Sequence, residues 1–155
     1  MHILESSITA SHRDNQAGEP AIVLYDGVCG LCNRLNQFLL KRDTHDHFRF
    51  ASLQSKFAQD LLQRHGADAR DLDTVYVAID YGLPTERLLA RSDAILHLLA
   101  KLNGIWKWTQ LGRILPKALR DEIYKLVARN RYRVFGKHES CPLPEPKHRE
   151  KFLDL

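Results

Sequence analysis

The sequence has little cysteine and no long apolar run, and each of these absences excludes a class of protein. Three cysteines among 155 residues cannot form the disulfide framework of a small secreted domain. No apolar stretch approaches the roughly 20 residues of a membrane-spanning helix. The N-terminus lacks a basic stretch followed by an apolar one, so we expect no secretory signal. These features together predict one cytoplasmic domain in a reducing compartment.

The composition contains no sign of disorder and only a modest excess of positive charge. Apolar residues make up 44% and charged residues 27%, which is ordinary for a globular domain. Lys and Arg outnumber Asp and Glu by 23 to 19. The excess lies near the end, at Arg129, Arg131, Arg133, Lys137, Lys147, Arg149 and Lys151. Without zinc-finger spacing or an RNP signature, nucleic acid is not an expected partner. A solvated helix end is the favoured explanation, and contact with anionic lipid stays open.

The most informative segment spans residues 26–32 and reads DGVCGLC. It follows an apolar run over residues 21–25 that is typical of a buried strand, and it precedes a helix with its apolar residues on one face. At a strand-to-helix turn, the first helical N–H groups and the helix dipole favour a thiolate. The spacing also lets Cys32 reach Cys29 within one turn. The segment therefore predicts a redox-active dithiol.

Two other interpretations of the cysteine pair were weighed. Cysteine is among the most buried residue types, so the pair could simply belong to the core. It could also be half of a metal site, completed by His138 and Cys141 more than a hundred residues later. Structural metal sites usually bring a second close pair of cysteines, whereas Cys141 is the only other cysteine in this chain. We therefore expect no bound metal and no cofactor beyond the Cys29–Cys32 disulfide itself.

The hydrophobic pattern predicts an α/β fold in one domain. Strands are expected over 21–25, 48–52, 74–79 and 86–90. Helices are expected from the cysteines to about Arg42, from Ser55 to about His65, and after Ser92, with both serines as N-caps. The resulting order, β-α-β-α-β-β-α, is the thioredoxin arrangement. Residues 1–18 are expected to form a mobile arm, residues 19–104 the core, and residues 105–155 a helical extension with a proline-containing tail.

The extension, residues 105–155, is expected to pack on the core. Pro116 is expected to begin a helix. One face of that helix is lined by Leu119, Ile123, Leu126, Val127 and Asn130. Trp106 and Trp108 could form a docking patch, but packing between the extension and the core is the favoured interpretation. The tail is expected to be extended because it contains three prolines.

With these motifs in hand, the chain resembles the DCC family of thiol-disulfide oxidoreductase-like proteins. The family pattern Asp-x-x-Cys-x-x-Cys corresponds to Asp26, Cys29 and Cys32. Further family-like segments read FASLQ over 50–54, RSDAI over 91–95 and NRYRVFG over 130–136. The resemblance implies a thioredoxin-like fold and a redox role, with no defined substrate. Thioredoxins carry a cis-proline before the third strand, whereas Thr74 occupies that region here, so a substrate-docking edge there is expected to differ.

The expected chemistry assigns a role to each residue of the motif. Cys29, at the exposed helix tip, is the attacking thiolate, and Cys32, one turn inside, resolves the mixed disulfide. The pKa of Cys29 is expected in the upper part of about 3.5–7.5. Asp26 relays a proton or tunes the thiol pKa values, or it only shapes the turn. Arg91 is a candidate contact for an anionic thiol such as glutathione.

The expected partners are a disulfide-containing protein or a small thiol substrate, together with an unknown electron donor. A different class of function stays open beside this one. The tryptophans, the basic helix end and the proline tail could form a non-enzymatic interaction domain in which the dithiol is a redox switch. Turnover distinguishes the two, because an oxidoreductase exchanges disulfides repeatedly whereas a switch changes its affinity once per oxidation.

Overall fold

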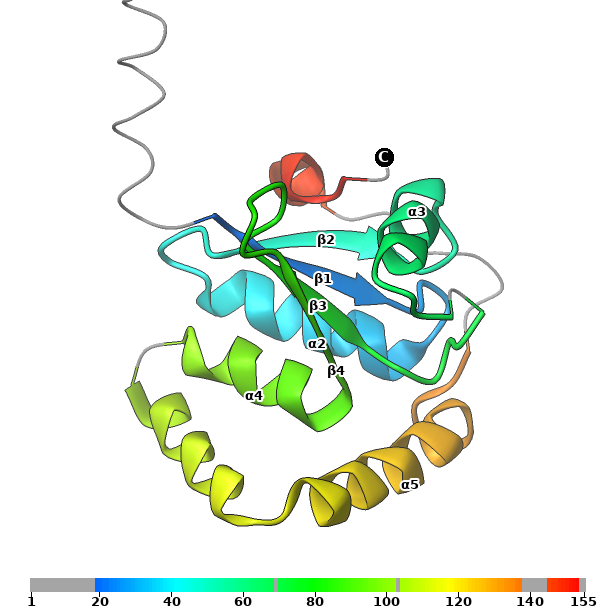
Figure 1. Ribbon diagram of the computed structural model, residues 1–155, viewed down its shortest axis with the longest axis vertical. Helices are drawn as coiled ribbons and strands as arrows, with labels where there is room; N and C mark the ends of the chain where they lie inside the picture. Colours follow the sequence, from blue (N-terminus) through cyan, green and yellow to red (C-terminus); the bar gives the residue numbers. More distant parts are fainter. Residues whose placement is uncertain (1–18, 69, 103, 138–144, 154–155) are drawn as a thin grey trace, which may run out of the picture.

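The computed structural model describes residues 19–68, 70–102, 104–137 and 145–153 (Figure 1). The expected arm over residues 1–18 lies outside these ranges, as do His138 and Cys141. The described chain forms a four-stranded mixed sheet in the order β2-β1-β3-β4. The strands are β1 (Ala21–Tyr25), β2 (Phe48–Ser52), β3 (Tyr76–Ile79) and β4 (Arg87–Ala90). All four strands fall where the sequence predicts them, although the last two are shorter at their N-terminal ends.

Strand β1 lies inside the sheet because every one of its side chains is apolar and buried. It pairs parallel with β2, where Val23 lies opposite Phe50, and antiparallel with β3, where Val23 lies opposite Val77. Alternate residues of a strand point to opposite faces. Val23 therefore packs in one core cluster and Leu24 in a second cluster on the other face. A strand apolar on both faces needs helices on both sides of the sheet.

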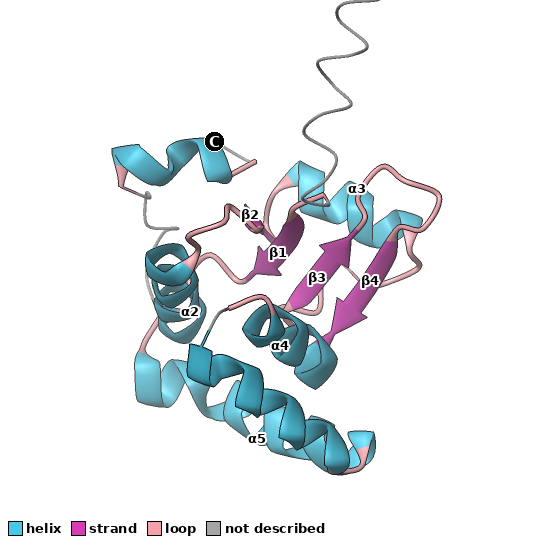
Figure 2. Ribbon diagram, turned by 90° about the vertical axis from the view of Figure 1, so that its left-hand side faces the viewer, coloured by secondary structure: helices cyan, strands magenta, loops and turns pink. Residues whose placement is uncertain are grey.

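Three helices provide that cover. Helices α2 (Gly30–Arg42) and α4 (Arg91–Ala100) lie on one face, and α3 (Lys56–Arg64) lies on the other (Figure 2). The order β-α-β-α-β-β-α is the predicted one, so the thioredoxin-like α/β class is confirmed. It brings the end of β1 and the start of α2, with both cysteines, to one edge of the molecule.

The two predicted serine caps have different outcomes. Ser55 does cap α3, because its hydroxyl accepts the Ala58 N–H at 3.2 Å. Ser92 does not cap α4: the helix begins at Arg91, its N-cap is Ala90, and no side chain caps it. The Ser92 hydroxyl instead donates to Asp121 of the extension. Since Arg120 also contacts Asp93 at 3.0 Å, these polar contacts fix the extension to α4.

The extension consists of a 3-10 helix, η2 (Gly104–Ile114), followed by α5 (Lys117–Phe135). Pro116 is the N-cap of α5, one residue before its predicted place as the first helical residue. The predicted apolar face of α5 exists, but it faces solvent: Leu119, Ile123, Leu126 and Val127 are all exposed. The buried residues are Ala128 and Arg131. Helix α5 therefore contacts α2 and α4 through a different side, the one that carries Ala128 and Arg131.

The two tryptophans of the extension lie in different environments. Trp106 packs edge-on against Phe38 of α2, with ring centroids 4.8 Å apart, as the packing interpretation predicts. Trp108 is 72% exposed, so that interpretation was wrong for this residue. After α5, the described tail contains a short 3-10 helix, η3 (Pro146–Lys151). Phe152 then stacks on Phe50 at 5.1 Å and places the tail along the outer edge of β2.

Candidate active site

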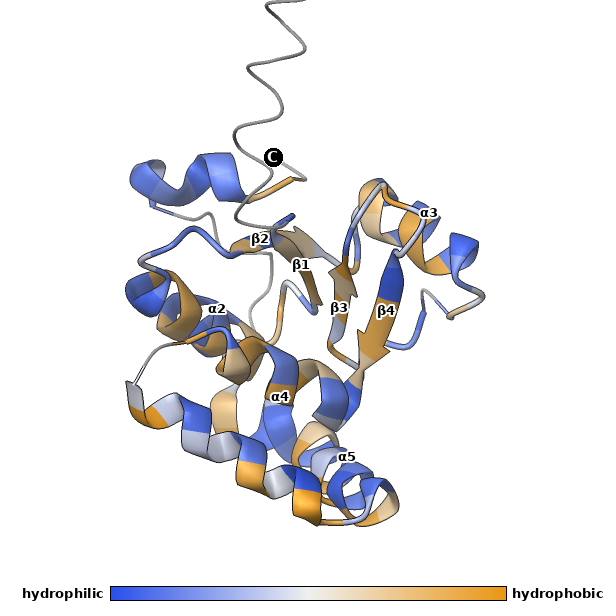
Figure 3. Cartoon of the chain, turned by 60° about the vertical axis from the view of Figure 1, so that its left-hand side comes forward, coloured by the Kyte–Doolittle hydropathy of each residue, from blue (hydrophilic) through white to orange (hydrophobic). Residues whose placement is uncertain are grey.

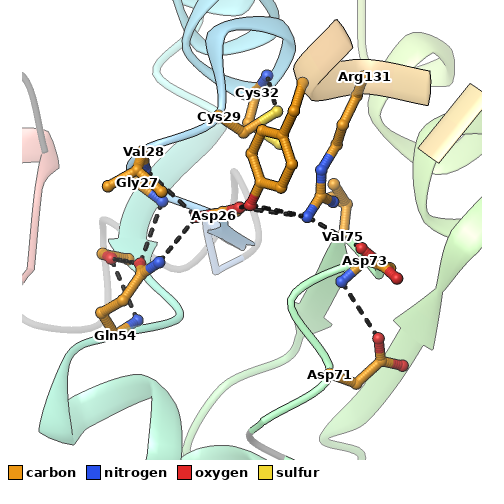
Figure 4. Close-up of polar contacts among 12 residues, drawn as sticks. Asp26, Gly27, Val28, Cys29, Cys32, Gln54, Asp71, Asp73, Val75 and Arg131 are labelled. Atoms are coloured by element: carbon orange, nitrogen blue, oxygen red, sulfur yellow. Dashed lines mark hydrogen bonds and ion pairs between the residues drawn. The ribbon is translucent and has the colours of Figure 1, made fainter. Parts of the chain in front are cut away.

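The two cysteines lie where β1 passes into α2 (Figure 4). Cys29 is the N-cap of α2, and its sulfur accepts the N–H of Cys32 at 3.4 Å. The two cysteines approach to 3.5 Å, and both are free thiols. The amide of Asn33 donates to the carbonyls of Gly27 and Cys29, which fixes the turn. The predicted arrangement, a leading sulfur that faces helical N–H groups, is present.

The environment makes the two thiols unequal. The pKa of Cys29 is lowered to about 6, first by the hydrogen bond from the Cys32 thiol, and further by backbone N–H groups and the charge of Arg131; burial opposes the shift. The pKa of Cys32 is raised, because its thiol donates to Cys29, is buried, and feels the charge of the neighbouring thiolate. At neutral pH the arrangement favours one thiolate, on Cys29, stabilised by the proton on Cys32.

Cys29 is fully buried, and its expected exposure at the helix tip was wrong. The segment that covers it lies at the C-terminal end of α5 and comprises Phe135, Gly136 and Lys137, here called the cover segment. The N–H of Gly30 donates to the carbonyl of Gly136 at 3.1 Å, and Cys29 forms an antiparallel bridge with Lys137. A residue more than a hundred positions away thus closes the helix tip, which no local pattern around the cysteines indicates.

The contact between the cover segment and the start of α2 requires a glycine at position 30, between the two cysteines. A Cβ on Gly30 would collide with the carbonyl oxygen of Phe135. Gly136 has a φ of 83°, in the left-handed region, which lets the chain turn at the end of α5 and reach the cysteines. The two glycines therefore allow α2 and the cover segment to approach backbone to backbone.

Asp26 lies at the centre of a buried polar cluster beside the dithiol. One carboxylate oxygen accepts the N–H of Val28 at 3.2 Å and the Gln54 amide at 2.7 Å. The other accepts Arg131 at 3.2 Å and the hydroxyl of Tyr132. Gln54 is itself oriented by the N–H of Gly27, which donates to its oxygen at 3.1 Å. All four of these partners of the Asp26 carboxylate are donors, so the cluster stabilises an anion at this position.

Arg131 supplies the positive charge of the cluster and is only 3% exposed. It binds Asp26 and, at 3.0 Å, Asp73. Burial alone would lower the pKa of Arg131, but the hydrogen bond with Tyr132 and the negative charge carried by the dithiol raise it. Burial and the hydrogen bond with Asp26 likewise raise the pKa of Tyr132 to about 12. Arg131 therefore stays protonated and favours thiolate formation in both cysteines.

The segment that contains the site is similar to known proteins. Residues 23–137 match the family described as DCC1-like thiol-disulfide oxidoreductase. The chain belongs to the DCC family. The uncharacterized protein YuxK of Bacillus subtilis is 38% identical over 132 residues, which cover 85% of this chain and 93% of YuxK. The chloroplastic DCC family protein At1g52590 of Arabidopsis thaliana is 34% identical over 125 residues, which cover 79% of this chain and 69% of that protein. No solved structure matches.

The family match covers every residue of the site, and it includes three that sequence reasoning missed. Gln54, Arg131 and Tyr132 all contact Asp26. Each lies in a segment already noted as typical of the DCC family, in FASLQ or in NRYRVFG. The position of these polar residues within family-like segments was the available signal, but nothing in their own sequence surroundings indicated a contact with Asp26.

The region that holds the cis-proline in thioredoxins is different in this DCC protein. The described residues contain no cis peptide bond. The N–H of Val75 donates to the hydroxyl of Tyr124 at 2.7 Å, and the carbonyl of Val75 accepts the N–H of Arg91. Thr74 donates to Asp71. The backbone groups of Val75 at this edge are thus occupied by the chain's own groups.

The dithiol and Arg91 line different cavities. Cys32 lines an almost wholly apolar cavity of about 230 Å³ between α2 and α5, together with Leu35, Ile95 and Tyr124. Arg91 lines a second cavity, of about 320 Å³, whose walls do not include either cysteine. Arg91 is therefore not brought to the sulfurs. Within the described residues no group of three or more potential ligands could hold a metal, while His138 and Cys141 lie outside them.

Proposed function

We propose that this DCC protein is a thiol–disulfide oxidoreductase that uses Cys29 as nucleophile and Cys32 as resolving thiol. The observation that carries the proposal is the inequality of the two sulfurs. One helix tip stabilises a thiolate on Cys29 with a pKa near 6, and the same hydrogen bond keeps Cys32 protonated until it is needed. A pair of merely structural cysteines has no need of this difference.

The reaction proceeds in two exchanges. The Cys29 thiolate attacks one sulfur of a substrate disulfide, forms a mixed disulfide and releases the other substrate sulfur as a thiolate, which takes up a proton. Cys32 then loses its proton and attacks the Cys29 sulfur, which releases the second substrate thiol. The substrate gains two electrons and the Cys29–Cys32 disulfide forms. A thiol reductant completes the cycle, and no other cofactor is required.

The cover segment adds one step before the chemistry. Because Cys29 is fully buried beneath residues 135–137, a substrate disulfide reaches it only after that segment moves away. The backbone contacts of the segment with Gly30 and Cys29 are few, which favours local opening over unfolding of α2. The substrate class is a disulfide-containing protein or a small disulfide, and the reducing cytoplasm is the proposed compartment.

Asp26 is best explained as a positioning residue. Its carboxylate already accepts four hydrogen bonds, so it holds Arg131 and Tyr132 in place beside the sulfurs. Arg131 in turn favours both thiolates. These contacts fit a role in which Asp26 tunes the thiol pKa values through Arg131. Direct relay of a proton fits them less well, because the carboxylate would have to give up one of its four hydrogen-bond donors.

Matched single-cysteine variants test the function. We expect Cys29→Ser to abolish reaction with an aromatic disulfide probe, and Cys32→Ser to accumulate a mixed disulfide through Cys29, seen by mass spectrometry. Serine differs from cysteine only in carrying oxygen in place of sulfur, so both variants should keep the parent fold. Each variant is therefore the matched control for the other. Trapping by Cys29→Ser and none by Cys32→Ser would reverse the assignment.

The burial of Cys29 also supports a second candidate, a redox-switched interaction domain. In that case formation of the Cys29–Cys32 disulfide would alter the cover segment and a binding surface, without turnover. Repeated reduction of a disulfide substrate in the presence of excess thiol reductant favours the oxidoreductase. A single oxidation event that changes only the affinity for a partner favours the switch.

A further inference from the structure

The outer side of the extension carries an apolar surface that nothing in the described chain covers. Four residues at a spacing of three recur along η2: Ile105, Trp108, Leu111 and Ile114. In a 3-10 helix, residues three apart lie directly above one another. These four therefore form one row, and they are 58–82% exposed. The residues between them, such as Trp106 and Gln110, face α2 and α4.

The row continues on α5. Leu119, Ile123 and Leu126 recur at the spacing of one helical face and are about half exposed. Both helices lie along the same side of the molecule, and apolar stretches are visible along both (Figures 1 and 3). We call these seven residues the outer apolar face. Apolar surfaces of this extent on soluble proteins mark sites of interaction.

The charge around this face is strongly positive. Residues 105–137 contain nine Lys and Arg against two Asp and Glu, a net charge of +7. The rest of the chain has 14 basic and 17 acidic residues, a net charge of −3. Lys107, Arg113, Arg129 and Arg133 are all exposed on the same two helices. The charge of the molecule is thus concentrated on the element that exposes the apolar residues.

We propose that the outer apolar face binds the surface of an anionic lipid bilayer. Exposed apolar side chains, including a tryptophan, with surrounding Lys and Arg are the features of helices that lie in the membrane interface. Each basic residue near an anionic surface adds to the attraction. A second copy of this chain is disfavoured as occupant, because a symmetric contact would bring the exposed basic residues of η2 and α5, among them Lys107, Arg113 and Arg129, close to the same residues of the other copy.

The binding is peripheral. No helix in the described ranges has both the length and the apolar character to cross a bilayer. The apolar rows instead place η2 and α5 parallel to the bilayer surface, with α4 and the sheet on the side away from the lipid. The proposal does not depend on the redox chemistry, since none of the seven residues touches either cysteine.

Vesicle sedimentation of the full chain tests the proposal. We expect binding to vesicles of phosphatidylcholine mixed with phosphatidylglycerol, weak binding to phosphatidylcholine alone, and loss of binding as salt increases. Trp108→Ser should weaken binding about tenfold, and Lys107→Gln about fivefold. The matched controls are Leu83→Ser, on the β3–β4 turn, and Lys56→Gln, on α3; both residues are exposed and both variants should bind as the parent does.

A second measurement keeps the result independent of folding defects. In Trp106→Phe, which retains an aromatic ring against Phe38, Trp108 is the remaining tryptophan. Its emission should shift to the blue on anionic vesicles and be quenched by lipids that carry a quencher. Absence of vesicle binding, equal loss in the controls, or a dimer in solution that Trp108→Ser dissolves would overturn the proposal. The first result would favour an acidic protein partner and the last a second copy. Cys29→Ser should bind vesicles normally.

Discussion

The two sides of α5 reverse the usual distribution of residues. The inner side buries an arginine, Arg131, beside Asp26 and the cysteines, whereas the outer side exposes Leu119, Ile123 and Leu126 to solvent. Arginine is almost never buried without a partner, and rows of exposed leucine and isoleucine are uncommon on monomeric proteins. The comparison teaches that this helix is not there only to complete the core. Its inner side places Arg131 beside Asp26 and the cysteines, and its outer side exposes an apolar surface.

The largest expected difference between the two sides of α5 concerns stability and is tested at Asp26, the partner of Arg131. We expect Asp26→Asn to destabilise the fold by about 3 kcal/mol, because it removes the partner of a buried charge. An amide cannot restore the contacts, since the groups that reach the Asp26 carboxylate are donors and its NH₂ would face one of them. Leu119→Ser, on the outer side, should change stability by no more than about 0.5 kcal/mol. Urea denaturation measures both.

A result in which both variants are equally stable would contradict this difference. It would show that Arg131 finds sufficient compensation in Asp73, its second carboxylate partner, which lies near the surface. Asp26 would then be a turn residue whose charge is dispensable. The fully buried position of Asp26 argues against that outcome.

The second expected effect concerns the charge that Arg131 contributes to the thiols. Cys29 has a pKa of about 6, so its alkylation rate should rise as pH increases through 6 and level off above about pH 7. Arg131→Gln removes one cause of the lowered pKa. The profile should therefore move to higher pH by up to about one unit, and the thiolate fraction below pH 6 should fall up to about tenfold. Alkylation mapped by mass spectrometry gives the profile.

Arg133→Gln is the matched control, because Arg133 lies two positions along the same helix and is exposed. It removes the same charge from the chain but not from the site, so its profile should coincide with that of the parent. Equal shifts in both variants would indicate a general effect of net charge, and the role given to Arg131 would then be wrong.

The sequence predicts the secondary structure and the dithiol better than it predicts the contacts of α5, and the reason is physical. Local periodicity and turn chemistry predict β1, α2, β2 and α3 closely, because strands and helices depend on neighbouring residues. The dithiol and the position of Asp26 in its turn are local as well. The contact of Arg131 with Asp26 joins residues 105 positions apart, and it depends on how α5 crosses α2.

The orientation of α5 explains the remaining errors. Its apolar residues recur with helical spacing, and a helix that is amphipathic usually turns that side to the core. The pattern alone cannot tell whether the core is already filled. Here α2 and α4 cover that face of the sheet, and small Ala128 with Arg131 fits against them. The same crossing carries Gly136 over the helix tip, which buries Cys29 against the sequence-based expectation.

The smallest expected effect lies at the cover segment, which connects the two sides at the end of α5. The ring of Phe135 lies 5.5 Å from the guanidinium of Arg34 on α2, and this contact helps to hold the segment over Cys29. A cation–π contact of this kind contributes about 0.5–1 kcal/mol. Phe135→Ala should therefore raise the population of the open segment, and with it the alkylation rate of Cys29, about two- to fivefold at a fixed pH.

The control is Val134→Ala, because Val134 is the preceding residue and is 68% exposed. It shortens a side chain on the same turn without loss of a contact to α2, so the rate should be unchanged. Both variants retain the backbone hydrogen bond from Gly30 to Gly136. The substitution should therefore change only how often the cover segment opens, and the pKa of Cys29 should stay near 6. A faster rate accompanied by a shifted pH profile would mean that the ring acts on the thiolate itself. An unchanged rate in Phe135→Ala would mean that opening does not limit access to Cys29, and the cover step would have to be removed from the proposed reaction.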